Sequence, residues 1–377
     1  MPVTTTFPLA LGYIWGCMAR LDSFLRLVVE QRASDLHFTA GSIPLIRHHG
    51  ALVPLPFRAV SDAEARKFLG EILNADERER LEAEHELDLL YSLPGVGRFR
   101  ANLFVQHGGW GAAFRIIPDQ PPRLQDIGLP GSVRALCSLQ NGLVLIGGPT
   151  GSGKTTTLAA IVDEINRTSR RHVLTIEDPI EFLHDPILSA ITQRQVGTHV
   201  DSFAEALRSA LRESPDVLVV GEMRDADTLQ LAMQAAETGV LVFGTLHTSS
   251  AAKTITRIVD MSPEDQREQL RSSLSVLLKG VVAQHLVRRA GGDGRVAAVE
   301  VMLTNAAVAS MIRDNKVAQL DAWLQTVNTI ETGMQSLEQC LLRYVKDGVV
   351  DIDEACQLSG NPEHLRRECA SAELESA

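Results

Sequence analysis

Residues 148–155 read Gly-Pro-Thr-Gly-Ser-Gly-Lys-Thr and fit the phosphate-binding pattern G-x-x-x-x-G-K-[ST]. The flanking residues fit as well, because Gly142 to Ile146 predict a short buried strand and Thr156 to Ile165 predict a helix. Glycines let such a loop curl so that its backbone N–H groups converge on phosphate oxygens, and the helix N-terminus adds partial positive charge there. This stretch predicts that the chain binds and hydrolyses a nucleoside triphosphate.

Individual residues of this loop have distinct expected roles. The Lys154 ammonium is expected to reach the β- and γ-phosphates, and the Thr155 hydroxyl to hold Mg²⁺. The predicted nucleotide-binding residues of the loop and of the first helical turn are Gly148, Pro149, Thr150, Gly151, Ser152, Gly153, Lys154, Thr155 and Thr156.

The composition narrows the class of protein. The chain has 377 residues, enough for two or three domains, and its net charge of −11 argues against a nucleic-acid partner, which requires basic surface. Its five cysteines are scattered and never in C-x-x-C spacing, which excludes a four-cysteine zinc site and a disulfide framework. These scattered cysteines fit a reducing cytoplasm, which is the expected location. No apolar run reaches the length of a membrane span.

The pattern of the chain predicts five segments. Residues 1–18 form an N-terminal extension, and either Met1 or Met18 is the true start. A small α/β domain (19–118), a proline-rich linker (119–122), an ATPase core (123–303) and a helical C-terminal region with its tail (304–377) follow in that order.

Both folded domains are predicted to be α/β. In the core, the short apolar strands 143–146, 173–176, 217–220 and 240–245 alternate with helical segments, which indicates a parallel sheet with helices on both faces. In the first domain the pattern predicts helices over 21–29, from Ser61 and over 76–86, and strands over 35–38, 43–55 (a hairpin broken at His49-Gly50), 98–106 and 110–117.

Three further segments of the core end a strand with polar side chains. Glu222 follows the strand 217–220, where a carboxylate is placed to organise Mg²⁺ and the attacking water. Glu177 ends the strand 173–176 and is a candidate general base, while a solvated loop is its alternative. His247 follows the strand 240–245 and could donate to the γ-phosphate, although a lone histidine is more often structural.

These four segments, in this order, resemble the secretion ATPase superfamily of type II secretion and type IV pilus motors, and within it the pilus retraction ATPases (the PilT-like group). Gly148–Thr155 is similar to the Walker A motif, and residues 175–182 to the Asp box. Residues 221–225 resemble the Walker B motif and residues 244–248 the His box. The resemblance covers nearly everything from about residue 21 to residue 365.

The resemblance implies a PAS-like N-terminal domain, a RecA-like ATPase domain and a ring-shaped homohexamer that uses ATP and Mg²⁺. Glu222 would be the catalytic glutamate, Glu177 would assist water activation, and His247 would sense the γ-phosphate. Arg98, Arg100 and Arg115 of the N-terminal domain would be candidates to approach the nucleotide. The ring would act at the inner membrane on a pilus platform protein, with other pilus ATPases as further candidate partners.

Alternatives within and outside the superfamily remain open. The missing four-cysteine zinc motif favours a retraction motor over an assembly motor. However, the family's Ala-Ile-Arg-Asn-Leu-Ile segment reads Ala-Val-Ala-Ser-Met-Ile at Ala307 to Ile312, so an accessory retraction paralogue or a secretion-type ATPase is an alternative. A RecA-like DNA translocase is a more distant one, and the acidic composition opposes it.

Overall fold

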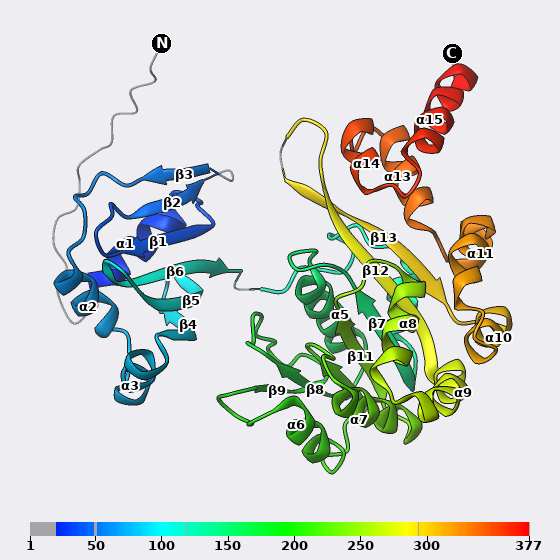
Figure 1. The fold of residues 1–377 in the computed structure, drawn as a ribbon, viewed down its shortest axis with the longest axis horizontal. Coiled ribbons are helices and arrows are strands. Elements are labelled where there is room, and N and C mark those ends of the chain that lie inside the picture. The colour runs from blue at the N-terminus through cyan, green and yellow to red at the C-terminus, as the bar shows by residue number, and fades with distance from the viewer. Residues whose placement is uncertain (1–19, 49–50, 119, 293, 377) are drawn as a thin grey trace. The chain divides into compact units, whose positions relative to one another are not determined.

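The computed structural model describes residues 20–48, 51–118, 120–292 and 294–376. The chain divides into two compact units, residues 1–119 and residues 120–377, and each is described by itself (Figure 1). The predicted extension 1–18 with its two candidate starts lies outside the described residues, as do His49 and Gly50. The finer domain bounds given above stay predictions.

Within its described residues, the first unit contains a six-stranded antiparallel sheet in the order β3-β2-β1-β6-β5-β4 and three helices. Apolar and charged residues alternate along β5, as expected for a strand with one face in the core. Phe99 and Ala101 are buried, while Arg98 and Arg100 lie on the other face. The elements are α1 (Arg20–Glu30), β1 (Asp35–Thr39), β2 (Leu45–His48), β3 (Ala51–Pro54), α2 (Asp62–Gly70), α3 (Ala75–Glu84), β4 (Glu86–Leu93), β5 (Gly97–Gln106) and β6 (Gly109–Ile117).

The start of α2 is as predicted, but the end of α3 is not. A capping box joins Ser61 and Glu64 at the N-terminus of α2. The prediction that the next helix runs to Glu86 is wrong, because α3 stops at Glu84 and His85 adopts a left-handed conformation (φ 66°). The residues that follow form β4, which pairs with β5 and was not predicted.

The second unit contains a seven-stranded sheet in the order β13-β12-β7-β11-β10-β8-β9. All neighbouring strands are parallel except β12 and β13, which pair antiparallel. The predicted strands are confirmed as β7, β8, β10 and β11. Its strands are β7 (Gly142–Gly147), β8 (His172–Glu177), β9 (Ala190–Gln195), β10 (Val217–Val220), β11 (Leu241–Leu246), β12 (Leu278–Arg288) and β13 (Arg295–Leu303).

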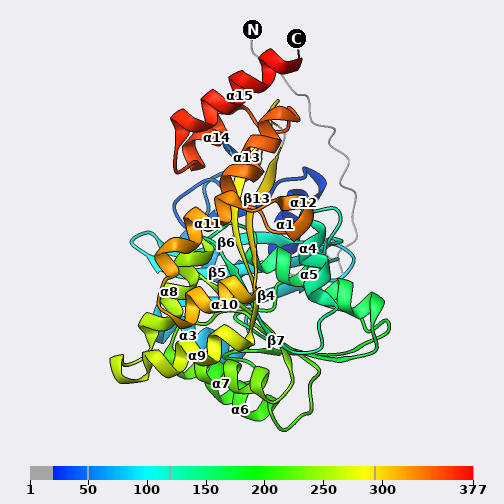
Figure 2. The ribbon, with the colours of Figure 1, turned by 90° about the vertical axis from the view of Figure 1, so that its right-hand side faces the viewer.

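Helices cover both faces of this sheet, as predicted (Figure 2). Along β7, Leu143 and Leu145 pack in the cluster that includes α6 to α11, whereas Val144 and Ile146 pack against α4 and α5. The fold class is therefore α/β. These helices are α4 (Gly131–Cys137), α5 (Lys154–Thr168), α6 (Phe203–Ala210), α7 (Ala226–Glu237), α8 (Ala251–Met261), α9 (Arg267–Leu277), α10 (Ala306–Arg313) and α11 (Leu320–Thr326).

The C-terminal region of the second unit is helical, with α12 (Thr329–Thr332), α13 (Leu337–Lys346), α14 (Ile352–Leu358) and α15 (Pro362–Ser376). In Figures 1 and 2, α13 to α15 lie at the opposite end of this unit from α6 and α7. A small separate core joins this region to the sheet, where Cys340 and Leu341 of α13 pack against Val296 and Ala298 of β13.

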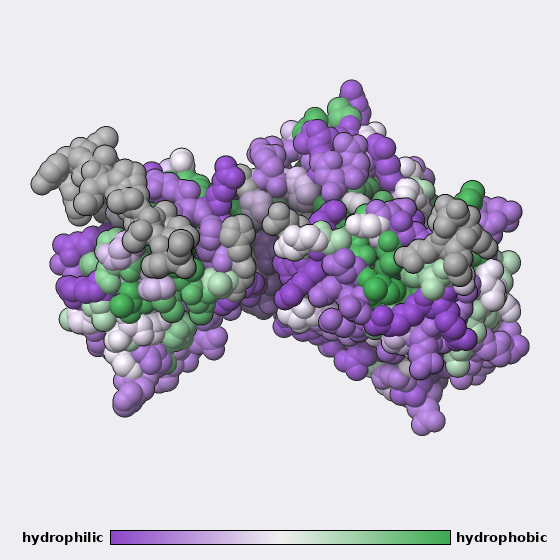
Figure 3. All heavy atoms as spheres, turned by 90° about the horizontal axis from the view of Figure 1, so that it is seen from above, coloured by the Kyte–Doolittle hydropathy of each residue, from purple (hydrophilic) through white to green (hydrophobic). Residues whose placement is uncertain are grey.

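The face of the first unit seen from the side on which β3 lies shows apolar side chains among polar ones (Figure 3). In the described part of this unit, the exposed large apolar side chains are Ile43, Leu52, Val53 and Phe57. Among the described residues, no helix combines the length and the apolar character needed to span a membrane.

Candidate active site

The phosphate-binding loop joins the end of β7 to the first turn of α5, where the sequence predicted it. Gly153 caps α5 in a left-handed conformation (φ 91°). Gly148 also has a positive φ (157°), and a Cβ there would lie 2.6 Å from the backbone oxygen of Gln284. Glycine is therefore required at Gly148 both for the backbone conformation and for the close approach of β12.

The side chain of Lys154 folds back onto this loop. Its Nζ atom donates to the carbonyl oxygens of Gly148 at 2.8 Å and Pro149 at 3.1 Å. Burial lowers the pKa of Lys154, and the negative charge of Glu222 opposes that shift. The ammonium is thus held at the loop by weak carbonyl partners, which phosphate oxygens can replace.

Glu222 is held by two side chains at the end of β10. His247 Nε2 lies 3.0 Å from Glu222 Oε1, and Arg224 donates to Glu222 Oε2 at 2.8 Å. Burial acts to raise the pKa of Glu222, but the hydrogen bond from Arg224 and the charges of Arg224, His247 and Lys154 outweigh it. The pKa of this carboxyl therefore lies below its ordinary value, and the group is ionised at neutral pH.

The order of the strands brings the predicted residues to one edge of the sheet. β10 lies between β8 and β11, and the Gly221 N–H donates to the carbonyl of Ile176 at 2.8 Å. Glu177 ends β8, Glu222 follows Gly221, and His247 follows β11. Because the carboxyl ends of parallel strands meet at the same edge, all three residues lie beside the loop that follows β7.

Glu177 is oriented by polar neighbours on β8 and β9. Thr175 Oγ1 donates to Glu177 Oε1 at 2.7 Å, and Gln193 Nε2 donates to the same oxygen at 3.1 Å. The Gln193 amide also donates to the carbonyl of Phe182 at 2.9 Å, in the segment between the two strands. This carboxylate is therefore built into a hydrogen-bonded network, unlike the side chain of a solvated loop.

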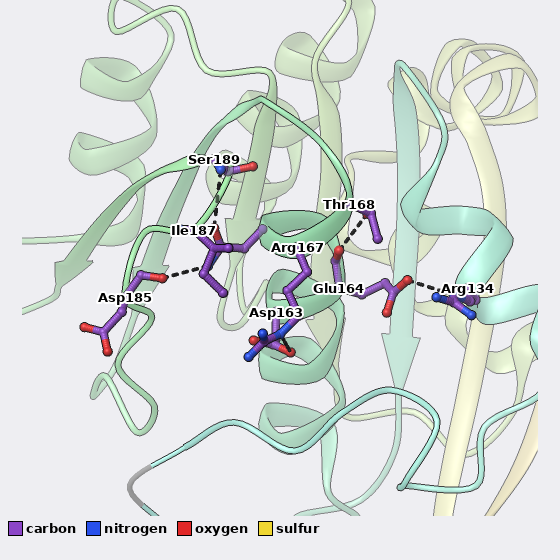
Figure 4. Close-up of polar contacts among 9 residues, drawn as sticks. Arg134, Asp163, Glu164, Arg167, Thr168, Asp185, Ile187 and Ser189 are labelled. Carbon is purple, nitrogen blue, oxygen red and sulfur yellow. Dashed lines mark hydrogen bonds and ion pairs between the residues drawn. The ribbon is translucent and has the colours of Figure 1, made fainter.

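The segment between Glu177 and β9 is fastened to α5 (Figure 4). The fully buried Asn166 of α5 donates to the carbonyl of Asp185 at 2.8 Å and accepts from the N–H of Ile187 at 2.9 Å. The hydroxyl of Ser189 donates to the carbonyl of Ser169 at 2.7 Å. The helix that begins at the phosphate-binding loop thus supports the segment that begins at Glu177.

The residues at the loop fit a nucleotide with Mg²⁺. Ser152 Oγ is buried and lacks a hydrogen-bond partner within the described residues, so a polar atom of the loop is available to a ligand. No group of three or more His, Cys, Asp or Glu side chains in the described part of the chain could hold a metal by itself. Mg²⁺ at such sites is bound by one or two side chains and the phosphates, a role that Thr155 and Glu222 fit.

The three predicted arginines lie in the first unit. Arg98 and Arg100 are on β5, and Arg115 of β6 pairs directly with Arg100 across the sheet. Arg115 Nε donates to Asp35 Oδ1 at 2.8 Å, while its side chain remains 73% exposed. Their approach to the nucleotide stays a prediction.

Comparisons with known proteins agree with this geometry. Residues 129–356 match the family model described as type II/IV secretion system protein. This chain belongs to that family. It is 44% identical to the type IV pilus retraction ATPase PilT of Pseudomonas aeruginosa over 345 residues, which are 92% of this chain and 99% of PilT.

A second relative and a solved structure point to the same family. A twitching motility protein of Neisseria gonorrhoeae is 42% identical over 93% of this chain and 94% of its own length. The crystal structure of the pilus retraction motor PilT with bound ADP superposes with a TM-score of 0.85 and 42% identity, covering 92% of this chain and 98% of that one. The family and the ATPase fold expected from the sequence are thereby confirmed.

Sequence reasoning missed three side chains of the site. Arg224 was given no role, although it lies two residues after Glu222. Gln193 was not assigned to Glu177, because only the strand pairing brings them together. Gln284 was overlooked, although a glutamine within the largely apolar run Gly280 to Val287 is a signal that the sequence contains, and the structure buries it.

Proposed function

We propose that this chain is the ATP-hydrolysing motor of type IV pilus retraction. The observation that carries the proposal is the meeting of Lys154, Glu222 and His247 at one strand edge, in a chain similar to a retraction ATPase over 92% of its length. A protein that only binds a nucleotide would not need an ionised carboxylate, held by a histidine, beside the lysine that binds the phosphates.

The residues divide the chemistry of ATP hydrolysis among them. Lys154 binds the β- and γ-phosphates, and the ionised Glu222 accepts a hydrogen bond from the attacking water. His247 responds to the γ-phosphate through its contact with Glu222, and Glu177 supports the same water. Thr155 and Glu222 would hold Mg²⁺, which neutralises phosphate charge when bound.

The proposed function includes a ring-shaped assembly of the chain. We infer a homohexamer in which Arg98, Arg100 or Arg115 stabilises the transition-state charge at the nucleotide. Arg115 is exposed, whereas Arg98 and Arg100 are half-buried, so Arg115 is the most accessible of the three. The ring acts at the inner membrane on the pilus platform protein, and hydrolysis moves one domain against the other to withdraw pilin.

ATP turnover and binding by Glu222→Ala test the catalytic part. The variant should bind ATP with an affinity close to that of the wild type but turn it over at least about a hundredfold more slowly, as expected when a water-positioning base is removed. Glu205→Ala, on the exposed surface of α6, is the control and should keep wild-type turnover. Near-normal turnover by Glu222→Ala would transfer the role to Glu177.

A second candidate, an accessory retraction subunit, is favoured by the departure at Ala307 to Ile312. Val308 and Ile312 are buried on α10, whereas Ala309 and Ser310 replace the family's arginine and asparagine at half-buried positions. The packing of α10 is thus kept while its polar groups change. An accessory subunit would leave retraction intact when deleted, provided that another retraction ATPase is present.

A further inference from the structure

Gln284 of β12 lies directly against the phosphate-binding loop. Ala283 pairs with Gly147, the last residue of β7, so Gln284 is placed where the loop begins. The residue is 2% exposed, and its amide uses both ends. Nε2 donates to the carbonyl of Ser152 at 2.7 Å, and Oε1 accepts from the hydroxyl of Thr157 on α5 at 2.7 Å.

Two glycines of the loop make this contact possible. A Cβ at Gly153 would lie 2.8 Å from Gln284 Nε2, and one at Gly148 would lie 2.6 Å from the Gln284 carbonyl oxygen. Such distances are shorter than carbon can approach nitrogen or oxygen without displacement. The loop is therefore packed on Gln284 at both of its ends.

The contact with Ser152 fixes the direction of an N–H group. In a planar trans peptide the carbonyl and the following N–H point in opposite directions. Since Gln284 holds the Ser152 carbonyl, the N–H of Gly153 must point away from Gln284. Backbone N–H groups of this loop are the donors that cradle phosphates, so their direction matters before the nucleotide arrives.

We propose that Gln284 is a positioning residue for nucleotide binding: its amide holds the Ser152–Gly153 peptide and Thr157 so that the loop keeps its phosphate-binding shape without ligand. The inference rests on the proposed function, because it requires nucleotide binding at this loop. Gln284 itself does not contact the phosphates.

Equilibrium titration of the full chain with a fluorescent ATP analogue, together with steady-state ATPase kinetics, tests the proposal. Gln284→Met keeps the length of the side chain but removes both hydrogen bonds, and it should raise the Kd and KM for ATP about tenfold. The kcat at saturating ATP should stay within about twofold, because bound triphosphate orders the loop again. A wild-type Kd would overturn the proposal.

Gln335 offers a matched control. It is a buried glutamine, 1% exposed, whose Nε2 donates to the carbonyl of Val299 at 2.8 Å. Gln335→Met should lower thermal stability without changing the Kd for ATP. If both variants raise the Kd equally, the effect is general destabilisation and the proposal fails.

Two further variants cover the cases in which Gln284→Met does not fold or the proposed function itself is wrong. If Gln284→Met does not fold, Thr157→Val removes one of the two hydrogen bonds and should raise the Kd about threefold, and an unchanged Kd would overturn the proposal. Lys154→Ala distinguishes failure of the role proposed for Gln284 from failure of the proposed function. If Lys154→Ala loses ATP binding while Gln284→Met binds ATP like the wild type, only the role of Gln284 is contradicted. If Lys154→Ala itself binds ATP like the wild type, the proposed function is contradicted.

Discussion

Glu300 should make the stability of this protein depend on pH between about 4.5 and 7. The carboxyl lies on β13, is 8% exposed, and accepts from the N–H of Ala251 at the start of α8 at 2.6 Å. Burial raises its pKa to about 7, aided by the charge of Asp321 and opposed by the N–H groups of Ala251 and Leu337 and by Lys253. The residue thus joins the first turns of α8 and α13.

The sign and size of the effect follow from this shift. In the unfolded chain the carboxyl loses its proton near its ordinary pKa of 4.5, but in the native state it keeps the proton up to about pH 7. Between these values the native state binds more protons, so the free energy of unfolding falls as pH rises. At about 1.4 kcal/mol per pH unit, the loss totals about 3 kcal/mol.

Chemical unfolding of the wild type and of Glu300→Gln, followed by circular dichroism at pH 5 and pH 8, measures this contribution. The amide resembles the protonated acid, so the variant lacks the titration. Other groups titrate alike in both proteins and cancel in the difference. Relative to the wild type, Glu300→Gln should gain about 2.5 kcal/mol between pH 5 and pH 8.

Glu268→Gln is the control for this experiment, since Glu268 lies exposed on α9. Because this side chain is exposed, its replacement should change the free energy of unfolding by less than about 0.5 kcal/mol. A pH-independent difference for Glu300→Gln would refute the reasoning, because it would mean that the buried carboxyl loses its proton at the same pH in both states.

Three further predictions concern the active site. Lys154→Ala should lose nucleotide binding and keep its circular dichroism spectrum, because Nζ donates its hydrogen bonds to carbonyls of the loop itself; wild-type affinity for ATP would contradict the assignment. His247→Ala should lower kcat about tenfold or more while the Kd for ATP changes less than about threefold, and a change confined to Kd would contradict a role in hydrolysis. Gln193→Met should lower kcat without weakening ADP binding, since its amide orients Glu177; unchanged turnover would show that Glu177 needs no such support.

Much of the fold followed from local patterns. The strands β7, β8, β10 and β11 each contain a short, largely apolar stretch, as expected for strands buried on both faces of a parallel sheet. By contrast, β9 reads Ala-Ile-Thr-Gln-Arg-Gln and lies at the edge of the sheet, so its sequence carries no such run. β4 follows a charge-rich helix without a glycine or proline between them, which hid the boundary at His85.

The site was predictable where one segment supplies its own chemistry. The loop from Gly148 to Thr155 is such a segment. Glu222, Glu177 and His247 were predicted as site residues because each lies at or just after the end of a recognisable strand, and the structure places those strand ends at one edge of the sheet; their roles stay predictions. Partners across the sheet were not predictable in this way. Gln284 and Ser152 are 132 residues apart in the chain, and only the order of the strands in the sheet brings them together.

Pilus retraction in a strain deleted for this gene, complemented with the wild type or with Glu222→Ala, shows directly whether this chain is the retraction motor. We expect that the wild type restores pilus withdrawal and that Glu222→Ala, produced at the same level, does not. Retraction that continues in the deletion strain at the wild-type rate would contradict the claim that this chain is the retraction motor.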